Sequence, residues 1–152
     1  MRNTIILLFI CLFAVSCGKD KFTSVPQITF KSVKPDRVAS NVIIGSPNVP
    51  VITINVTDAE GDLGFKTGTD TSYIHIKNLL INRVDSFYLP DLQTVATRNF
   101  QGDILINVFD ILRGSTRPRP KVDTLQYEIY VVDFAKNKSN VIVTEPLYYV
   151  SP

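Results

Sequence analysis

Acidic side chains cluster directly after one of the alternating apolar segments of this 152-residue chain. Residues 51–57 lead into Asp58, Glu60 and Asp62, which occupy every second position of the stretch TDAEGDLG. Calcium takes about six to eight oxygen ligands, and carboxylates are prominent among them. The spacing therefore suggests a calcium site. The simpler alternative is a solvated polar turn, for which Asp and Gly are equally suited.

A second acidic position, Asp133, ends another alternating segment at residues 124–133. Side chains alternate across a strand, so Asp58 continues the inward row of its strand and Asp133 continues the row of the later one. The resemblance to Ig-like sandwiches described below implies that the loops after these two strands lie at the same end of the domain. Two carboxylates brought together there repel unless they are well solvated or a cation lies between them. The candidate calcium ligands are Asp58, Glu60, Asp62, Asp133 and Asn137.

Other metal chemistry has few residues to draw on. His75 is the only histidine, and both cysteines, Cys11 and Cys17, lie near the N-terminus. Transition metals prefer imidazole and thiolate ligands, so no such site is expected. The acidic stretch also differs from an EF-hand loop, because Gly61 comes too early and Thr69 stands where a bidentate Glu belongs.

The residue types also give little support for catalysis. A nucleophile–base pair would have to be built around His75, with no cysteine in the predicted domain. Asp58 and Asp133 could formally act as a carboxylate pair of the glycosidase type, but they are expected on a convex loop end without a cleft. We therefore predict a protein that is not an enzyme. The formal net charge of only +2 further argues against nucleic-acid binding.

The elements that must position these residues are strands. Short alternating segments bounded by Pro, Gly, Asn and Asp recur along the chain, without helical periodicity or an internal repeat. Seven or eight such segments in one domain predict an all-β fold with a two-sheet antiparallel sandwich. Residues 90–101 fit either a short helix or an irregular crossover. The predicted strands are residues 27–33, 38–44, 51–57, 73–82, 86–89, 103–112, 124–133 and 140–149.

The N-terminal segment has the features of an export signal. Arg2 precedes an apolar run at residues 4–15, which is shorter than the roughly 20 residues that a membrane-spanning helix needs. The run ends in AVSC, and small residues before Cys17 resemble the lipobox of bacterial lipoproteins, in which cleavage exposes a lipid-modified cysteine. An ordinary secretory signal followed by a chance cysteine is the alternative.

The lipoprotein resemblance implies a three-part organisation of the chain. Residues 1–16 are expected to form the signal peptide, residues 17–25 the lipidated Cys17 with a polar tether, and residues 26–152 the folded domain. It also implies a lipid-anchored location in the cell envelope, expected at the outer membrane, with the membrane as a partner through the N-terminal lipid.

A second resemblance concerns the fold. The stretch DTLQYEI has Asp123, Leu125, Tyr127 and Ile129 at alternate positions and resembles the D-x-A-x-Y-x-C pattern of strand F in immunoglobulin-like domains. Tyr127 would then be a tyrosine corner, whose hydroxyl ties the preceding loop to the strand. The chain has no Trp, which favours an Ig-like bacterial sandwich over an antibody-type domain.

Two loop motifs extend this resemblance to a protein class. VVDFAKNKSN, at residues 131–140, resembles the D-x-A-G-N-x-S hairpin of bacterial Ig-like and cadherin-like modules, with Lys136 in the glycine position. Together with TDAEGDLG it resembles single-domain Bacteroidetes lipoproteins of uncharacterised function. The resemblance implies an envelope lipoprotein that acts as a binding or structural module for an unknown protein or glycan, stabilised by calcium if the acidic loops bind it.

Two further surfaces carry alternative interpretations. The alternative function is that of a carbohydrate-binding accessory lipoprotein in a glycan-uptake system, which requires aromatic side chains on an exposed sheet face. The basic loop RGSTRPRPK, at residues 113–121, is expected at the end opposite the acidic loops, either as a site for an acidic partner or as a solvated loop stiffened by proline. The candidate aromatic residues are Tyr73, Phe87, Tyr88, Tyr130 and Tyr148.

Overall fold

The computed structural model describes residues 21–64, 71–89, 92 and 98–152. Within these ranges the chain is built from strands, and the only helix is the short 3-10 helix η1 (Phe109–Ile111). No helix in the described ranges is long and apolar enough to cross a membrane. The all-β prediction is thus confirmed. The strands are β1 (Gln27–Lys34), β2 (Arg37–Ala39), β3 (Val51–Asp58), β4 (Tyr73–Asn78), β5 (Arg83–Tyr88), β6 (Phe100–Asn107), β7 (Lys121–Leu125), β8 (Tyr127–Val132), β9 (Ile142–Val143) and β10 (Leu147–Ser151).

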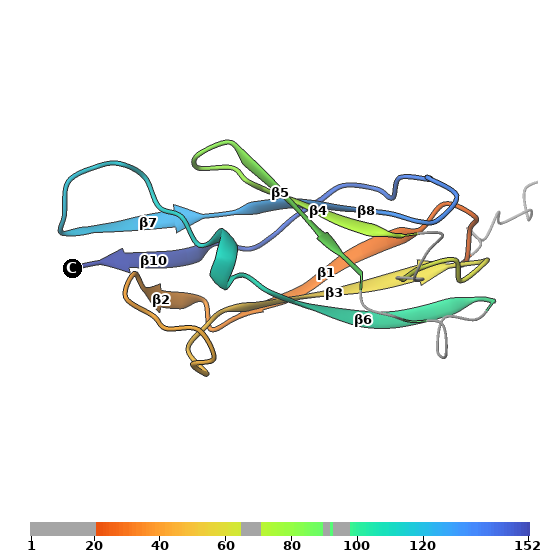
Figure 1. Cartoon of the computed structure of the whole chain (residues 1–152), viewed down its shortest axis with the longest axis horizontal. Coiled ribbons are helices and arrows are strands. Elements are labelled where there is room, and N and C mark those ends of the chain that lie inside the picture. The colour runs from red at the N-terminus through yellow and green to blue at the C-terminus, as the bar shows by residue number, and fades with distance from the viewer. Residues whose placement is uncertain (1–20, 65–70, 90–91, 93–97) are drawn as a thin grey trace, which may run out of the picture.

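Three sheets are formed, with strand orders β1-β3-β6, β5-β4-β8-β9 and β2-β10-β7. All pairings are antiparallel except that of β2 with β10, which is parallel. The first two sheets form two layers of a sandwich-like fold, and the third lies toward one end, where the C-terminus is found (Figure 1).

The core lies between these layers because alternate side chains point inward. In β3 every second residue is buried, and Ile52, Ile54 and Val56 are fully inaccessible to solvent. Burying a side chain of this kind stabilises the fold by about 1.5–3 kcal/mol. The strand predicted at residues 124–133 corresponds to β7 and β8 together, and its inward row runs unbroken from Asp123 to Asp133.

Several predicted strands are shorter in the structure. The segment predicted at residues 38–44 pairs only as β2, and Ile43 and Ile44 are each 72% exposed beyond it. The strand predicted at residues 73–82 ends at Asn78, whose side-chain oxygen accepts a hydrogen bond from the Leu80 N–H at 3.0 Å and begins the turn to β5. A local side-chain bond of this kind competes with continued strand pairing.

The other differences lie in the second half of the chain. The strand predicted at residues 103–112 stops at Asn107, where its side-chain oxygen accepts the Phe109 N–H and η1 begins. Residues 140–149 are divided between β9 and β10. Of the ambiguous segment 90–101, the structure describes residue 92 and residues 98–101. The predicted signal peptide, Cys17 and the first part of the tether lie outside the described residues.

Candidate cation site

Three acidic side chains predicted to share a site lie together in the structure. One carboxylate oxygen from each of Asp58, Asp62 and Asp133 is within 4.8 Å of the other two. We call these residues the acidic triad. Asp58 ends β3 in one layer and Asp133 follows β8 in the other, and both are fully buried, whereas Asp62 is half-buried. The predicted convergence of the two acidic loops is therefore confirmed.

The first loop is folded around the Asp58 carboxylate. The backbone N–H of Gly61 donates a hydrogen bond to Asp58 Oδ1, and Gly61 has a φ of 67°, a left-handed conformation that glycine adopts without steric cost. The loop after β3 is also hydrogen-bonded to the loop after β8. Phe134 N–H donates to the Asp62 carbonyl at 3.0 Å and Ala135 N–H donates to Asp62 Oδ2 at 3.2 Å. These bonds fix Asp62 against the second loop.

The second loop is folded around Asp133. The backbone N–H of Asn137 donates to Asp133 Oδ1 at 2.7 Å, and Asn137 Nδ2 donates to Asp133 Oδ2 at 2.9 Å. The turn requires a left-handed residue at Lys136, with a φ of 69°. This conformation gives a physical reason why glycine is favoured at the equivalent position of the D-x-A-G-N-x-S pattern.

The acidic triad is short of hydrogen-bond donors and positive charge. Asp58 Oδ2 and Asp62 Oδ1 are buried and have no hydrogen-bond partner, and no salt bridge reaches the triad from the described residues. Burial, together with the neighbouring carboxylates, raises the pKa of Asp58 to about 6 despite the bond from Gly61. Burial and the charge of Asp133 also raise the pKa of Asp62. A cation between the three carboxylates would satisfy both free oxygens and neutralise the repulsion.

The two other candidate ligands lie at the edge of the triad. Glu60 is exposed, and its Oε1 accepts a hydrogen bond from Ser24 Oγ at 2.7 Å. The Asn137 amide group uses its Nδ2 to hold Asp133, so its contribution is to position a triad carboxylate. The structure thus brings Asp58, Asp62 and Asp133 into one cluster and places the other two candidates around it.

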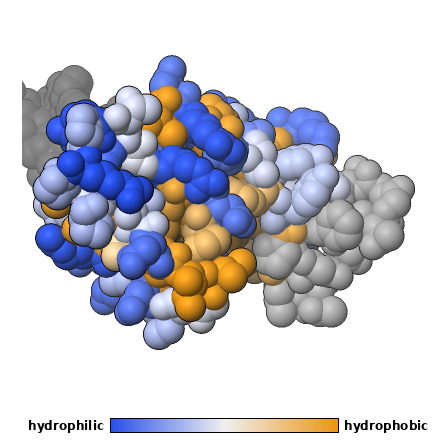
Figure 2. All heavy atoms as spheres, turned by 60° about the vertical axis from the view of Figure 1, so that its left-hand side comes forward, coloured by the Kyte–Doolittle hydropathy of each residue, from blue (hydrophilic) through white to orange (hydrophobic). Residues whose placement is uncertain are grey.

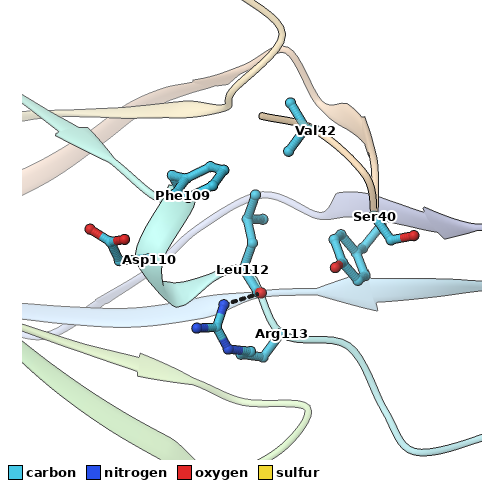
Figure 3. Close-up of a pocket in the computed structure, with 7 residues that line it drawn as sticks. Ser40, Val42, Phe109, Asp110, Leu112 and Arg113 are labelled. Carbon is cyan, nitrogen blue, oxygen red and sulfur yellow. Dashed lines mark hydrogen bonds between the residues drawn. The ribbon is translucent and has the colours of Figure 1, made fainter. Parts of the chain in front are cut away.

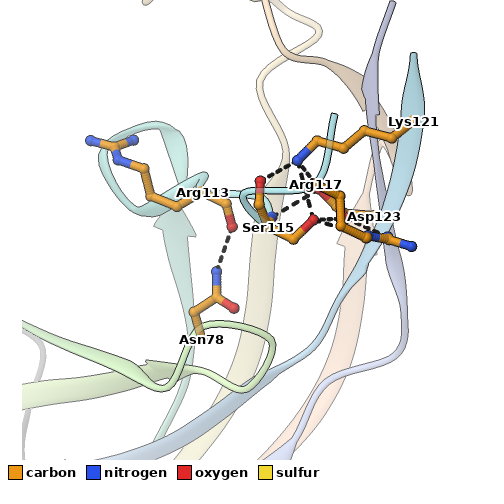
Figure 4. Close-up of polar contacts among 6 residues, drawn as sticks. All are labelled: Asn78, Arg113, Ser115, Arg117, Lys121 and Asp123. Atoms are coloured by element: carbon orange, nitrogen blue, oxygen red, sulfur yellow. Dashed lines mark hydrogen bonds and ion pairs between the residues drawn. The ribbon is translucent and has the colours of Figure 1, made fainter. Parts of the chain in front are cut away.

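A buried carboxylate outside the acidic triad, Asp123, was not identified from the sequence as a site residue. It accepts hydrogen bonds from Ser115 Oγ at 2.6 Å and Arg117 Nη2 at 2.7 Å, and Lys121 Nζ lies 3.0 Å from its Oδ2 (Figure 4). Burial alone would raise the pKa of Asp123, but these bonds outweigh it and hold the pKa well below its ordinary range. Asp123 could have been identified from the sequence, because it continues the inward-facing alternate positions of the following strand and comes just after the basic loop.

These contacts give the basic loop a structural role. The loop lies at the end of the molecule opposite the acidic triad, as predicted (Figure 1). Gly114 is needed there for close approach, because a Cβ on it would collide with Asp123 Oδ2 and approach the Tyr149 ring. Arg117 and Lys121 are committed to Asp123. The loop is therefore not simply solvated, because two of its four cations pair with a buried carboxylate of the fold.

Tyr127 does not form the hydrogen bond expected of a tyrosine corner within the described part of the chain. Its side chain is fully buried in the core, and its hydroxyl has no hydrogen-bond partner. Burial raises the pKa of this hydroxyl well above its ordinary value. The loop that precedes β7 is instead joined to the end of β4, by a hydrogen bond from Asn78 Nδ2 to the Arg113 carbonyl at 3.0 Å (Figure 4).

An aromatic row crosses the outer face of the β5-β4-β8 sheet. The ring centroids of Tyr88 and Tyr73 are 5.2 Å apart, and those of His75 and Tyr130 are 4.6 Å apart and stacked. Lys138 Nζ lies 3.8 Å from the Tyr130 ring centroid. The Tyr130 ring is thus in contact with two polar side chains, His75 from β4 and Lys138 from the loop after β8.

The other two aromatic candidates lie elsewhere. Phe87 packs against the core and Tyr148 belongs to β10 in a different sheet. His75 Nδ1 is 2.8 Å from Ser86 Oγ, a contact between neighbouring strands β4 and β5. Burial and the charge of Lys138 lower the pKa of His75. Three hollows in the described structure are lined by residues other than His75 and Ser86.

A small hollow lies at the end of the molecule that carries the basic loop. It has a volume of about 120 Å³ and is lined by the apolar side chains of Val42, Phe109 and Leu112 together with Arg113 and Tyr149 (Figure 3). Arg113 Nη1 donates to the Leu112 carbonyl at 2.8 Å beside it. Apolar surface gathers in and below the hollowed centre of this side of the molecule, with hydrophilic side chains around it (Figure 2).

Comparison with known proteins does not extend these observations. The chain matches no protein-family model, no curated protein and no solved structure. The acidic triad and its surroundings are therefore the features from which function is inferred.

Proposed function

We propose that this protein is an envelope lipoprotein of the type found in Bacteroidetes, anchored through Cys17, whose Ig-like domain is a non-enzymatic binding or structural module stabilised by calcium at the acidic triad. The supporting observation is that Asp58 Oδ2 and Asp62 Oδ1 are buried beside a third carboxylate, with no hydrogen-bond partner among the described residues. Buried charges are normally paired or coordinate metals.

A hard cation such as calcium fits this donor set better than a transition-metal ion. All three side chains offer carboxylate oxygens, the ligands of hard cations, and the triad includes no thiolate or imidazole. Two oxygens bound to one calcium ion at about 2.4 Å lie at most about 4.8 Å apart, so the triad can accept the ion with little movement. Asp58, Asp62 and Asp133 would hold it, and water or backbone carbonyls would complete the shell.

Titration calorimetry of the full chain in detergent tests the calcium site. We expect saturable binding of one calcium ion, which Asp62→Asn weakens at least tenfold. Asp36→Asn is the matched control, because Asp36 is an exposed aspartate near the opposite end of β1. Absence of calcium binding to the unaltered chain would refute the calcium part of the proposal.

The lipid anchor is supported by the apolar run and the small residues that precede Cys17. In bacterial cells grown with labelled palmitate, we expect the label on the chain and in the membrane fraction. Cys17→Ser should abolish labelling, whereas Cys11→Ser, in the predicted signal peptide, should leave it intact. Equal labelling of the two variants would argue against lipidation at Cys17.

A second candidate function, carbohydrate binding, is favoured by the row of Tyr73, Tyr88 and Tyr130 on one sheet face. Sugars stack on open faces of aromatic rings, but the Tyr130 ring already stacks on His75 and has Lys138 Nζ over it. We therefore rank this function second. Binding on a glycan array that is lost in Tyr73→Ala would reverse the order.

A further inference from the structure

The acidic triad adjoins the place where the chain enters the domain. Ala59 N–H donates a hydrogen bond to the Thr23 carbonyl at 3.1 Å, and Ser24 Oγ donates to Glu60 Oε1 at 2.7 Å. From the other loop, Asn137 Nδ2 donates to the Ser24 carbonyl at 3.2 Å. Two consecutive residues of the N-terminal segment thus bridge the loop after β3 and the loop after β8.

These contacts are directly connected to triad carboxylates. Ala59 follows Asp58 in the chain, so its N–H moves with the end of β3. The Nδ2 group of Asn137 donates both to Asp133 Oδ2, at 2.9 Å, and to the Ser24 carbonyl. A displacement of Asp133 would therefore change the position of the group that holds Ser24.

The other contacts of residues 21–25 within the described part of the chain are local, between near neighbours in the sequence. Lys21, Thr23, Ser24 and Val25 are exposed, and Phe22 is half-buried. The segment is attached mainly through hydrogen bonds at the surface, each of which contributes little by itself. Its attachment consequently depends on how well the two loops are held in place.

We infer that cation binding at the acidic triad strengthens the attachment of residues 21–25 to the domain. Occupancy of the site then controls whether this N-terminal segment stays attached, and we call this coupling the latch. This inference rests on the proposed function, because it requires the ion. Without a cation, Asp58, Asp62 and Asp133 repel one another and push the two loops apart. With it, the loops are drawn together and both sets of contacts to Thr23 and Ser24 form.

The latch has a consequence for a lipid-anchored protein. The segment that it would hold is the end of the predicted tether, so the bound ion would shorten the free tether and orient the acidic end of the domain toward the membrane. Because coupling between two equilibria is reciprocal, attachment of the segment must strengthen cation binding by the same factor.

Two measurements on the full chain in detergent test the latch separately from the cation site. The first is cleavage after Lys21 by a lysine-specific protease that needs no calcium. We expect cleavage about fivefold slower in millimolar calcium than in chelator. The second is calorimetry of Ser24→Ala, which removes the hydrogen bond to Glu60. We expect its calcium affinity to fall about fivefold, whereas Ser86→Ala, on the outer sheet face, should bind normally.

The outcomes distinguish the two proposals. If the unaltered chain binds calcium but cleavage after Lys21 is unchanged, or if Ser24→Ala binds calcium as tightly as the unaltered chain, the latch is wrong and the cation site stands. If the unaltered chain does not bind calcium, the calcium site and the latch both fail. Slower cleavage and weaker binding of Ser24→Ala together would establish the latch.

Discussion

Asp123 and Asp133 lie at opposite ends of one inward-facing row of the β7–β8 segment, and both are fully buried. Asp123 is paired with Arg117 and Lys121, whereas Asp133 has amide donors from Asn137 and no cationic partner among the described residues. A buried charge is costly unless it is compensated. One end of the domain therefore carries its counter-charge in the chain, whereas no cationic side chain of the described residues reaches the carboxylate at the other end.

The first prediction concerns Asp58→Asn, which should have opposite effects with and without calcium. In chelator the variant should be more stable than the unaltered chain by about 1 kcal/mol, because one of three mutually repelling carboxylates is removed. In calcium at a hundred times its dissociation constant the unaltered chain should gain about 2.7 kcal/mol, and the variant nothing. Urea unfolding measures both. A variant that is strongly destabilised in chelator would contradict this account.

The second prediction is a stability change with pH in chelator. The pKa of Asp58 is raised from 3.8 to about 6, so between these values the folded state binds more protons than the unfolded state. The contribution of Asp58 to stability is therefore fully present below pH 4 and decreases, by at most about 3 kcal/mol, as the pH rises through 6. The raised pKa of Asp62 acts in the same direction.

The lowered pKa of His75 acts in the opposite direction, since the unfolded state then takes up the proton first as the pH falls through 6.5. The measurement is therefore the difference in unfolding free energy between the unaltered chain and Asp58→Asn from pH 4 to 7, in which the His75 contribution cancels. A difference that does not vary with pH would contradict the raised pKa.

The third prediction separates the two cations beside Asp123. Lys121→Met should destabilise the fold by about 2–3 kcal/mol, because the Lys121 side chain is only 10% exposed and its loss leaves a buried carboxylate undercompensated. Arg117→Ala should cost about 1 kcal/mol or less, since its side chain is 64% exposed. Chemical denaturation at pH 7 compares them. Equal losses would show that solvent exposure does not decide their contributions.

The fourth prediction tests the close packing at Gly114. A methyl group there would meet the Asp123 carboxylate and the Tyr149 ring, so Gly114→Ala should destabilise the fold by about 1–3 kcal/mol. Thr116→Ala, at an exposed position of the same loop, is the control and should change stability by less than about 0.5 kcal/mol. Thermal unfolding of both variants checks the difference. An unchanged melting temperature for Gly114→Ala would mean that the loop can shift without cost.

The fifth prediction distinguishes a tyrosine corner from a simple core residue. Because the Tyr127 hydroxyl is buried without a partner among the described residues, Tyr127→Phe should be neutral or stabilise the fold by up to about 1 kcal/mol. A tyrosine corner would instead lose a hydrogen bond, with a destabilisation of about 1 kcal/mol. Urea unfolding of the single variant decides between them.

Much of the fold was predictable because strands leave a period of two in the sequence. The alternation around Ile54 and Ile129 predicts β3 and β8, and both residues are fully buried as expected. The same parity predicts that Asp58 and Asp133 continue inward rows. Strand ends were less predictable, since they depend on local side-chain bonds such as that of Asn78 to the Leu80 N–H.

The sequence by itself determined which residues face inward, because parity along a strand is a property of the chain alone. That the two acidic loops share one end of the domain was implied only by the resemblance to Ig-like sandwiches. Only the tertiary structure decided which carboxylates receive donors. Asp123 and Asp133 have the same parity and burial, yet one meets Lys121 and the other meets Asp58. That difference depends on which segments the sheets bring together from distant parts of the chain, and spacing along one strand does not encode it.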